Sequence, residues 1–288
     1  EGAPDHALSL IQSGSSEHAI DMLERRATRL EKLLGPKHYD TVETRAFLAM
    51  ANAAVGNREA ALKLFAQSVP LMLQRSRQSE THSEGTQSIT FKRRTVLESY
   101  ISLLADISGS SLEANAGIDA ASEAFKLADA ARSSTVERML AKSSARSAVL
   151  DPQLSGLARK EQDLQRQISA QWASLSAGTQ NGVITGSATD GPRTVIDDLR
   201  AARAAIMEEI EEKFPDYAET INPSRISIDG VRNLLRQDER LLSVYMGDRT
   251  TFVWSISKSD AAKMYVIDRS RDEMDWLIAD VHQGLDPT

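Results

Sequence analysis

The chain has 288 residues, more than one ordinary domain, and it is 41% hydrophobic but only 5% aromatic, a composition typical of helical arrays. Its 34 basic and 41 acidic residues give a formal net charge of −7, which argues against general nucleic-acid binding because that needs a basic face. Cysteine is absent, so these residues hold no disulfide, no thiolate metal site and no cysteine nucleophile.

No apolar run reaches the length of a membrane span, and we expect no membrane partner. The sequence shows no signal peptide, although it begins with Glu1 rather than methionine, which leaves a removed upstream targeting segment open. The compartment therefore stays open, with a cytoplasmic location as the favoured alternative.

Residues 1–150 contain an internal repeat of a glycine, a small alanine and two bulkier apolar residues. The first copy recurs 42 positions later, as Gly14, Ala19, Ile20, Leu23 and then Gly56, Ala61, Leu62, Phe65. The pattern predicts pairs of helices with glycine at the turn and alanine where the two helices cross closely. A third copy, at Ala121, Phe125 and Ala128, lacks the turn glycine and follows a longer connection. We therefore predict stacked antiparallel helix pairs over residues 1–150.

The repeat resembles the tetratricopeptide family, and the segment LLGPKHYDTVET resembles the longer inter-repeat linker of the kinesin-light-chain type. The resemblance implies a groove, lined by the first helix of each pair, that binds a protein or peptide partner. Peptide-binding members commonly place Asn in this helix, where this chain has Ala46 and Phe47. The nearest polar residues are Arg45 and Asn52, which we predict to face the groove without the usual backbone clamp.

Residues 151–222 carry two seams in which apolar residues are spaced alternately three and four positions apart, as in coiled coils. The first seam is Leu154, Leu157, Glu161, Leu164, Ile168, Gln171 and Leu175, and the second is Ile196, Leu199, Arg203, Ile206, Ile210 and Lys213. Between them, residues 178–192 are rich in Gly, Ser and Thr and predict a flexible linker. We expect an antiparallel helical hairpin in which Leu157 and Leu164 face Ile206 and Ile210 and Glu161 faces Arg203.

Residues 223–288 change to short apolar strands, at 241–246, 251–256 and 264–267. Gly247-Asp248 between the first two predicts a tight hairpin turn with positive φ. Ser270 and Glu273 have the spacing of a capping box, and an apolar helix face follows at Met274, Leu277, Ile278, Val281 and Leu285. Three strands and one helix cannot close a core, so we expect exposed apolar surface and the beginning of a larger domain.

The segment that leads into these strands carries a second resemblance. Its features are Phe214-Pro215-x-Tyr217, Leu234-Leu235, Leu241-Leu242-Ser243-x-Tyr245 and a Trp-containing strand from Phe252 to Ile256. In order and spacing they resemble the opening of the CHAT domain, the caspase-like module that bacteria fuse to tetratricopeptide repeats. The expected fold is therefore mostly α: a tetratricopeptide-like helical array (1–150), an antiparallel coiled-coil hairpin (151–222) and a small α+β segment (223–288) that begins an incomplete CHAT domain.

Complete members of that family resemble caspase-type cysteine peptidases, in which a Cys thiolate attacks the carbonyl and a His moves the proton. No position here matches either residue, so we expect no catalytic residue, no cofactor and no metal site. His18 and His38 are expected to be exposed. Trp172, Trp254 and Trp276 are expected to be packing anchors, because no basic surface surrounds them.

Two functions fit these expectations. The first is the regulatory, protein-interaction front part of a bacterial caspase-like cysteine peptidase, whose repeats bind a partner and control a protease half outside this chain. The alternative is a non-catalytic tetratricopeptide scaffold or adaptor protein. The expected partners are a protein or peptide in the groove and, at the strands, either a C-terminal CHAT half or a second copy of the chain. Whether the parent protein is an enzyme stays open.

Overall fold

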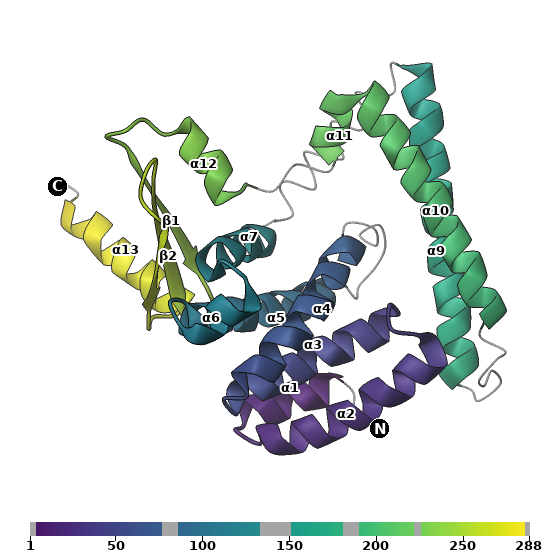
Figure 1. Ribbon diagram of the computed structural model, residues 1–288, viewed down its shortest axis with the longest axis horizontal. Helices are drawn as coiled ribbons and strands as arrows, with labels where there is room; N and C mark the ends of the chain where they lie inside the picture. The colour runs from purple at the N-terminus through teal and green to yellow at the C-terminus, as the bar shows by residue number, and fades with distance from the viewer. Residues whose placement is uncertain (1–3, 77–85, 133–150, 181–189, 222–225, 286–288) are drawn as a thin grey trace. The chain divides into compact units, whose positions relative to one another are not determined.

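The computed structural model describes residues 4–76, 86–132, 151–180, 190–221 and 226–285. In these residues the chain is mostly helical, with one small three-stranded antiparallel sheet (Figure 1). The chain forms two compact units: Glu1–Arg93 with Ser134–Ser224 make unit 1, and Arg94–Ser133 with Arg225–Thr288 make unit 2. Each unit combines two separate stretches of chain, so the units cut across the three predicted segments.

Unit 1 begins with two helix pairs. Their helices are α1 (Pro4–Gln12), α2 (Ser16–Leu34), α3 (Tyr39–Ala54) and α4 (Arg58–Ser76). Helix α3 packs against α1, α2 and α4 and is buried over most of its length. Gly14 and Gly56 form the turn of each pair with the same positive φ of 81°, and no atom lies within 4 Å of the Cβ that each lacks. The backbone conformation, rather than a lack of space, therefore selects glycine at both turns.

The small alanines of the repeat lie where the sequence predicts them. Ala19 and Ala61 are fully buried, and so are Leu23 and Phe65 four positions after them. In unit 2, Ala121 is also buried. The burial expected for these alanines is confirmed, and close helix crossings at them stay a prediction.

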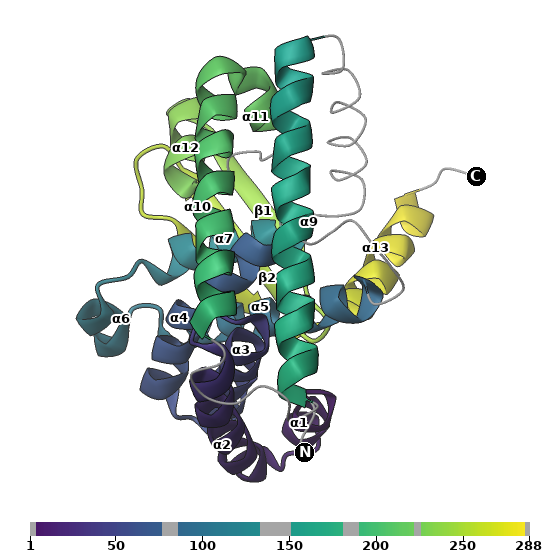
Figure 2. The ribbon, with the colours of Figure 1, turned by 90° about the vertical axis from the view of Figure 1, so that its right-hand side faces the viewer.

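Helices α9 (Pro152–Gln180) and α10 (Asp190–Lys213) lie side by side in opposite directions (Figures 1 and 2). Leu154 and Leu157 near the start of α9 cluster with Ile210 near the end of α10. Ile168 further along α9 clusters with Ile196 near the start of α10. The predicted antiparallel hairpin is confirmed.

An ion pair lies between these two apolar clusters. Arg203 Nε donates to Glu161 Oε1 at 2.6 Å, and both side chains are largely buried. The short helix α11 (Pro215–Ile221) continues the cluster of Leu154, Leu157 and Ile210, to which it adds Ala218 and Tyr217. Glu161 and Arg203 therefore face each other, as their opposite charges predict.

The connection between α9 and α10 is shorter than predicted. Helix α9 runs to Gln180 and α10 begins at Asp190, so both ends of the predicted linker 178–192 are helical. Residues 181–189 lie outside the described part, as do residues 133–150, the last part of the predicted helical array. Periodicity placed the helices correctly, but Gly and Ser composition exaggerated the length of the linker between them.

The hairpin also packs against the helix pairs of unit 1. Leu34 at the end of α2 is buried with Ile168 and Ile196, and Leu30 and Leu33 pack against the same cluster. The hairpin is therefore part of the same compact unit as the first two pairs. The sequence pattern does not predict this contact of α2 with the hairpin. The apolar residues of α2 have a helical periodicity that would be the same whichever helix they contact.

Unit 2 takes the second part of α5 (Thr86–Ile107), the short α6 (Ser111–Ala116) and α7 (Ala120–Arg132). The inserted α6 lengthens the connection of this third helix pair. The turn glycine expected to be missing is present but displaced: Gly117, with a φ of 64°, lies four residues before Ala121, whereas Gly14 lies five before Ala19.

The sheet of unit 2 contains β1 (Arg240–Met246), β2 (Thr251–Ser257) and β3 (Lys263–Ile267), in the order β1-β2-β3 and antiparallel throughout. Residues 247–250 connect β1 to β2, and Gly247 N–H donates to the Thr250 carbonyl at 3.0 Å. Gly247 does not have a positive φ, so the expected reason for a glycine in this turn is wrong.

One face of the sheet packs against helices of unit 2. Trp254, which is fully buried, donates its indole N–H to the Ala121 carbonyl at 3.0 Å and meets the edge of the Phe125 ring at 5.8 Å between centroids. Phe252 and Tyr245 continue this aromatic row along the same face. Helix α12 (Ile228–Leu234) packs on β2 through the buried Ile228 and Val231.

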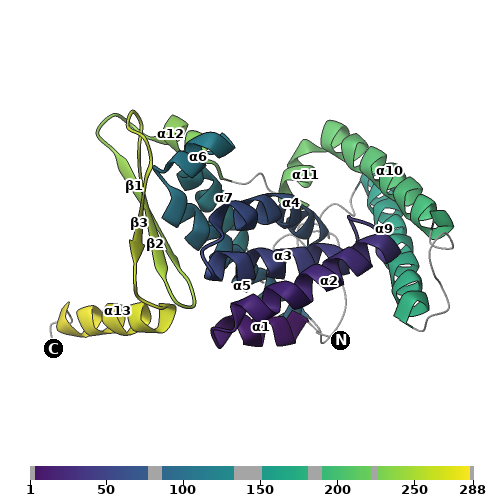
Figure 3. The same ribbon diagram turned by 60° about the horizontal axis from the view of Figure 1, so that its bottom comes forward.

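Helix α13 (Arg271–Leu285) follows the sheet and extends on the side opposite α7 (Figures 1 and 3). It begins with the predicted capping box: Glu273 N–H donates to Ser270 Oγ at 3.3 Å, and Ser270 N–H donates to Glu273 Oε2 at 2.8 Å. These bonds satisfy backbone donors that the first turn of a helix leaves unpaired. Across all the described helices, none combines the length and the apolar character that crossing a membrane requires.

Candidate functional site

The two residues predicted to face a partner groove both make contacts within unit 1. Arg45 Nη2 lies 2.7 Å from Glu31 Oε2 on α2. Asn52 is buried, donates its amide to the Leu48 carbonyl at 2.9 Å and accepts a hydrogen bond from Asn57 at 3.3 Å. Arg45 thus ties α3 to α2, and Asn52 braces the turn between α3 and α4. A partner-binding role for either residue stays a prediction.

His38 is another residue that sequence reasoning misplaced. It is buried rather than exposed, and its Nδ1 accepts the backbone N–H of Asp40 at 3.1 Å, which caps the start of α3. His18 is exposed, as expected. Among the residues with described positions, no three His, Asp or Glu side chains come together in a way that could hold a metal ion.

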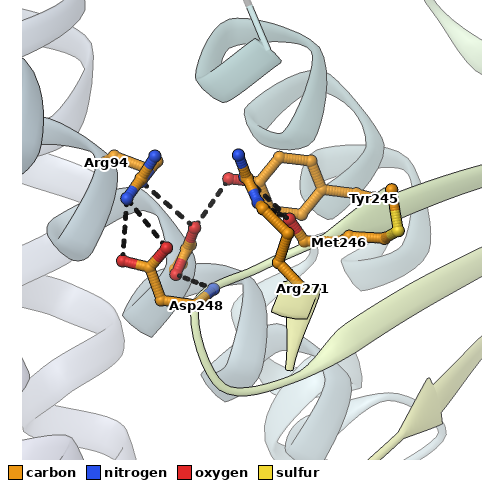
Figure 4. A network of polar contacts seen from close by, with 6 residues as sticks. Arg94, Tyr245, Met246, Asp248 and Arg271 are labelled. Atoms are coloured by element: carbon orange, nitrogen blue, oxygen red, sulfur yellow. Dashed lines mark hydrogen bonds and ion pairs between the residues drawn. The ribbon is translucent and has the colours of Figure 1, made fainter. Parts of the chain in front are cut away.

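One polar arrangement of unit 2 links distant parts of the sequence: the Glu98 cluster, made of Arg94, Glu98, Tyr245 and Asp248 (Figure 4). The Tyr245 hydroxyl donates to Glu98 Oε1 at 2.8 Å, and Asp248 N–H donates to Glu98 Oε2 at 3.0 Å. Arg94 Nη2 donates to both Asp248 carboxylate oxygens, at 2.8 and 2.9 Å, while Arg94 Nε lies 3.7 Å from Glu98 Oε1. A helix, a strand and a turn therefore meet at one carboxylate.

Burial dominates the electrostatics of this cluster. It raises the pKa of Glu98 above the usual range, although the hydrogen bonds from Asp248 and Tyr245 act in the opposite direction. Burial also raises the pKa of the Tyr245 hydroxyl, and the adjacent Glu98 carboxylate raises it further. Tyr245 therefore stays protonated and serves as a hydrogen-bond donor.

Gly247 is part of the cluster through its lack of a side chain. A Cβ at this position would lie 2.7 Å from the Thr250 carbonyl oxygen and 3.3 Å from Glu98 Cδ. Its carbonyl accepts the backbone N–H of Arg271 at 2.9 Å, and the Arg271 guanidinium donates to the Met246 carbonyl at 2.9 Å. The start of α13 is thereby fixed to the same turn.

The second notable feature of unit 2 is apolar surface without cover. We call the sheet face that points away from Trp254 the open face; Leu242, Val244, Tyr265 and Ile267 lie on it and are exposed, Leu242 by 65%. On α13, four further apolar residues are exposed: Trp276, Leu277, Ile278 and Val281. The expectation of exposed apolar surface on the strands is confirmed.

The tryptophans expected to be packing anchors differ from one another. Trp254 is the most deeply buried large side chain of the sheet, as predicted, whereas Trp276 is 66% exposed. The side chain of Trp172 lies outside the described part. The prediction is therefore right for Trp254 and wrong for Trp276.

In unit 2, the Glu98 cluster links separate elements, and the open face and α13 expose apolar surface. In the Glu98 cluster every carboxylate faces a donor, and neither a hydroxyl with a lowered pKa nor an imidazole accompanies it. In comparisons with known proteins, no family model, no curated protein and no solved structure matches this chain.

Proposed function

We propose that the chain is a protein-interaction module, the regulatory front part of a caspase-like cysteine peptidase whose protease half lies outside these residues. The observation that carries the proposal is the uncovered apolar surface of unit 2, on the open face and on α13. Contiguous apolar patches larger than a few hundred Å² are rare on proteins that act alone, and they mark interaction surfaces. In this proposal the protease half covers the open face.

The helix pairs supply the second part of the proposal. Two pairs in unit 1 share the same turn glycine, buried alanine and apolar residue, which supports a tetratricopeptide-like array. Such arrays bind protein or peptide partners, and Arg45 is the predicted contact because its guanidinium retains some exposure beside Glu31. The resemblance of residues 214–267 to the CHAT opening supplies the caspase-like part.

The alternative is a non-catalytic scaffold of the same architecture. It is favoured by the absence of cysteine from all 288 residues, because a thiolate nucleophile would have to come from elsewhere. Both functions predict that this chain alone cleaves no peptide. The purified protein, incubated with a broad fluorogenic peptide library, should show no turnover above buffer, and turnover that follows the protein through successive columns would contradict both.

The coding sequence that follows Thr288 in the parent gene separates the two functions. The peptidase proposal expects a His and, later, a Cys, each at the end of an apolar strand; without them, only the scaffold remains. If they are present, the following segment should bind this chain when the two are expressed separately. Leu242→Glu on the open face should weaken that binding by at least about tenfold, or ~1.4 kcal/mol.

Peptide ligands selected by phage display test the groove. Their affinity should fall by about tenfold in Arg45→Ala, which corresponds to ~1.4 kcal/mol. Lys63→Ala, which removes an exposed charge from α4, is the matched control and should leave affinity unchanged. Equal losses in both variants would assign the binding to general charge and reject the groove.

A further inference from the structure

The two edges of the sheet are treated differently. In an antiparallel ladder, alternate residues direct their N–H and C=O groups away from the neighbouring strand, so an edge strand presents unpaired groups. On β1 two of these carbonyls are occupied: Arg132 Nη2 donates to the Val244 carbonyl at 2.8 Å, and Arg271 Nη2 donates to the Met246 carbonyl at 2.9 Å. The β1 edge is therefore capped by two guanidinium groups.

The β3 edge has no such cap among the residues that the structure describes. The Val244 and Met246 carbonyls point away from β2, so their partners Val253 and Thr251 direct their backbone groups toward β3. Tyr265 and Ile267 are paired with those two residues, which leaves Met264 and Val266 as the residues whose backbone groups point outward. The strand contains no proline and pairs without a bulge, and Tyr265 and Val266 are about half exposed (50% and 54%). Proline and bulges are two of the devices that protect an exposed edge in natural proteins, and β3 has neither. Its one charged residue, Lys263, is the first of the strand and lies outside the outward-pointing pair Met264 and Val266.

We infer that β3 pairs antiparallel with β3 of a second copy of this chain, about a two-fold axis that passes through Tyr265. Outward-pointing residues must pair with outward-pointing residues. Only the register centred on Tyr265 sets Met264 of each copy opposite Val266 of the other, so that both outward residues are paired within the strand. A shift by two positions in either direction leaves Met264 or Val266 opposite a residue beyond the strand.

The side chains suit this register. Tyr265 of the two copies would face each other at a non-hydrogen-bonded position, where Cβ atoms are closest and aromatic pairs stabilise a sheet. The two open faces would join into one apolar surface. The interface is isologous, since the same strand serves both copies.

The capped β1 edge favours a second copy of this chain, rather than an unrelated strand, as the partner of the β3 edge. The joined sheet would have the order β1-β2-β3-β3-β2-β1, so both of its outer edges would be β1 edges carrying Arg132 and Arg271. Pairing therefore stops at two copies and leaves no uncapped edge. An unrelated strand would present a new edge in place of the old one. This inference does not depend on the proposed function.

A charge-complementation experiment tests the register. The unmodified chain, followed by analytical ultracentrifugation over a concentration series, should reach twice the 31.6 kDa mass of one chain. Tyr265→Lys and Tyr265→Glu should each be monomeric, because like charges would face each other across the axis. An equimolar mixture of the two should regain the dimer, because lysine then faces glutamate.

Two further variants complete the test. Val266→Pro removes only an outward N–H, so it should abolish the dimer while the circular dichroism of the monomer is kept. Leu242→Lys adds a charge to the same face on the far strand and should leave the dimer intact. A chain that is monomeric at every concentration, a mixture that stays monomeric, or a Leu242 variant that dissociates would each overturn the inference.

Discussion

Glu98 links three parts of unit 2 through one partly buried carboxylate, which accepts hydrogen bonds from Tyr245 on β1 and from the backbone of Asp248 in the turn. Its pKa is raised by burial, so the protonated carboxyl is favoured in the folded state. This contribution to stability is fully present below the unfolded value of 4.5 and is lost as the pH rises through the raised folded value.

The expected result is a pH-dependent difference between the protein and Glu98→Gln, which does not titrate. The free energy of unfolding of the unmodified chain, minus that of the variant, should increase as the pH falls from neutral to below 4.5. Urea unfolding at several pH values measures it. The subtraction cancels other titrating groups, including Glu43, whose pKa burial raises in the same direction.

Tyr245→Phe provides a second check, because it should change the pKa of Glu98 in a known direction. Because the Tyr245 hydroxyl lowers the pKa of Glu98, its removal should raise that pKa and shift the pH window upward. If the difference in the free energy of unfolding does not change with pH, or rises toward alkaline pH, burial does not destabilise the ionised carboxylate of Glu98.

The prediction for Gly247 rests on the atoms that surround it rather than on its backbone conformation. In Gly247→Ala the new Cβ would lie 2.7 Å from the Thr250 carbonyl oxygen, so the turn or Glu98 must move. Such overpacking costs roughly 1–3 kcal/mol, measurable as a lower urea midpoint. The control is Gly156→Ala in α9, where no atom lies within 4 Å of the added Cβ. It should stabilise by about 0.5–1 kcal/mol, because alanine favours a helix.

Single residues differ in how well the sequence reveals them. Gly14 and Gly56 could be predicted because a repeat places two glycines in the same local pattern, and the pattern itself requires the turn. Gly247 was recognised for the wrong reason. Its neighbour Glu98 is about 150 positions away in the sequence, and no local pattern encodes that contact. His38 was misplaced because its imidazole caps α3 while the rest of the side chain is buried.

The hairpin of α9 and α10 is held by apolar clusters at both ends and by Glu161 with Arg203 between them. Because both side chains of this pair are largely buried, the pair should be strongly coupled. A double-mutant cycle with Glu161→Gln and Arg203→Gln should give a coupling energy of ~0.5–3 kcal/mol in thermal or urea unfolding. Exchange of the two residues should recover most of the loss, and a coupling near zero would show that the pair is open to water.

The crossing of α3 and α4 gives a prediction with a matched neighbour. Ala61 is fully buried, so Ala61→Leu should destabilise by roughly 1–3 kcal/mol through overpacking. Ala60 precedes it in the same helix and is exposed, so Ala60→Leu should have little effect. Melting temperatures of the two variants decide the matter, and equal melting temperatures would contradict a tight crossing at Ala61.

Periodicity therefore predicted the elements better than their partners. The seams of α9 and α10 specify an antiparallel pair because both the apolar residues and the charges match in reverse order. The same reasoning could not reveal that the end of α2 joins the hairpin, since an apolar stripe specifies only that a helix face is buried. The open face shows the converse case, in which an apolar stripe is present and remains exposed.

At the scale of the whole molecule, the chain enters each unit twice. Unit 1 takes residues before Arg94 and again from Ser134 to Ser224, and unit 2 takes the intervening residues and those after Ser224. Sequence segmentation assumed that neighbours along the chain share a domain. That assumption failed here because the core of unit 2 depends on the contacts of Trp254 with Ala121 and Phe125, which are made between distant parts of the sequence.

This alternation has a consequence for synthesis on the ribosome. The helices of unit 2 that receive Trp254 are complete at Arg132, but β1 begins only at Arg240. At about 5–20 residues per second, the wait is on the order of ten seconds. During it the Phe125 surface has no strand to cover it, while α9 and α10 emerge and can join the end of α2. Unit 2, whose first helices are made before the hairpin of unit 1, therefore stays incomplete until unit 1 is finished.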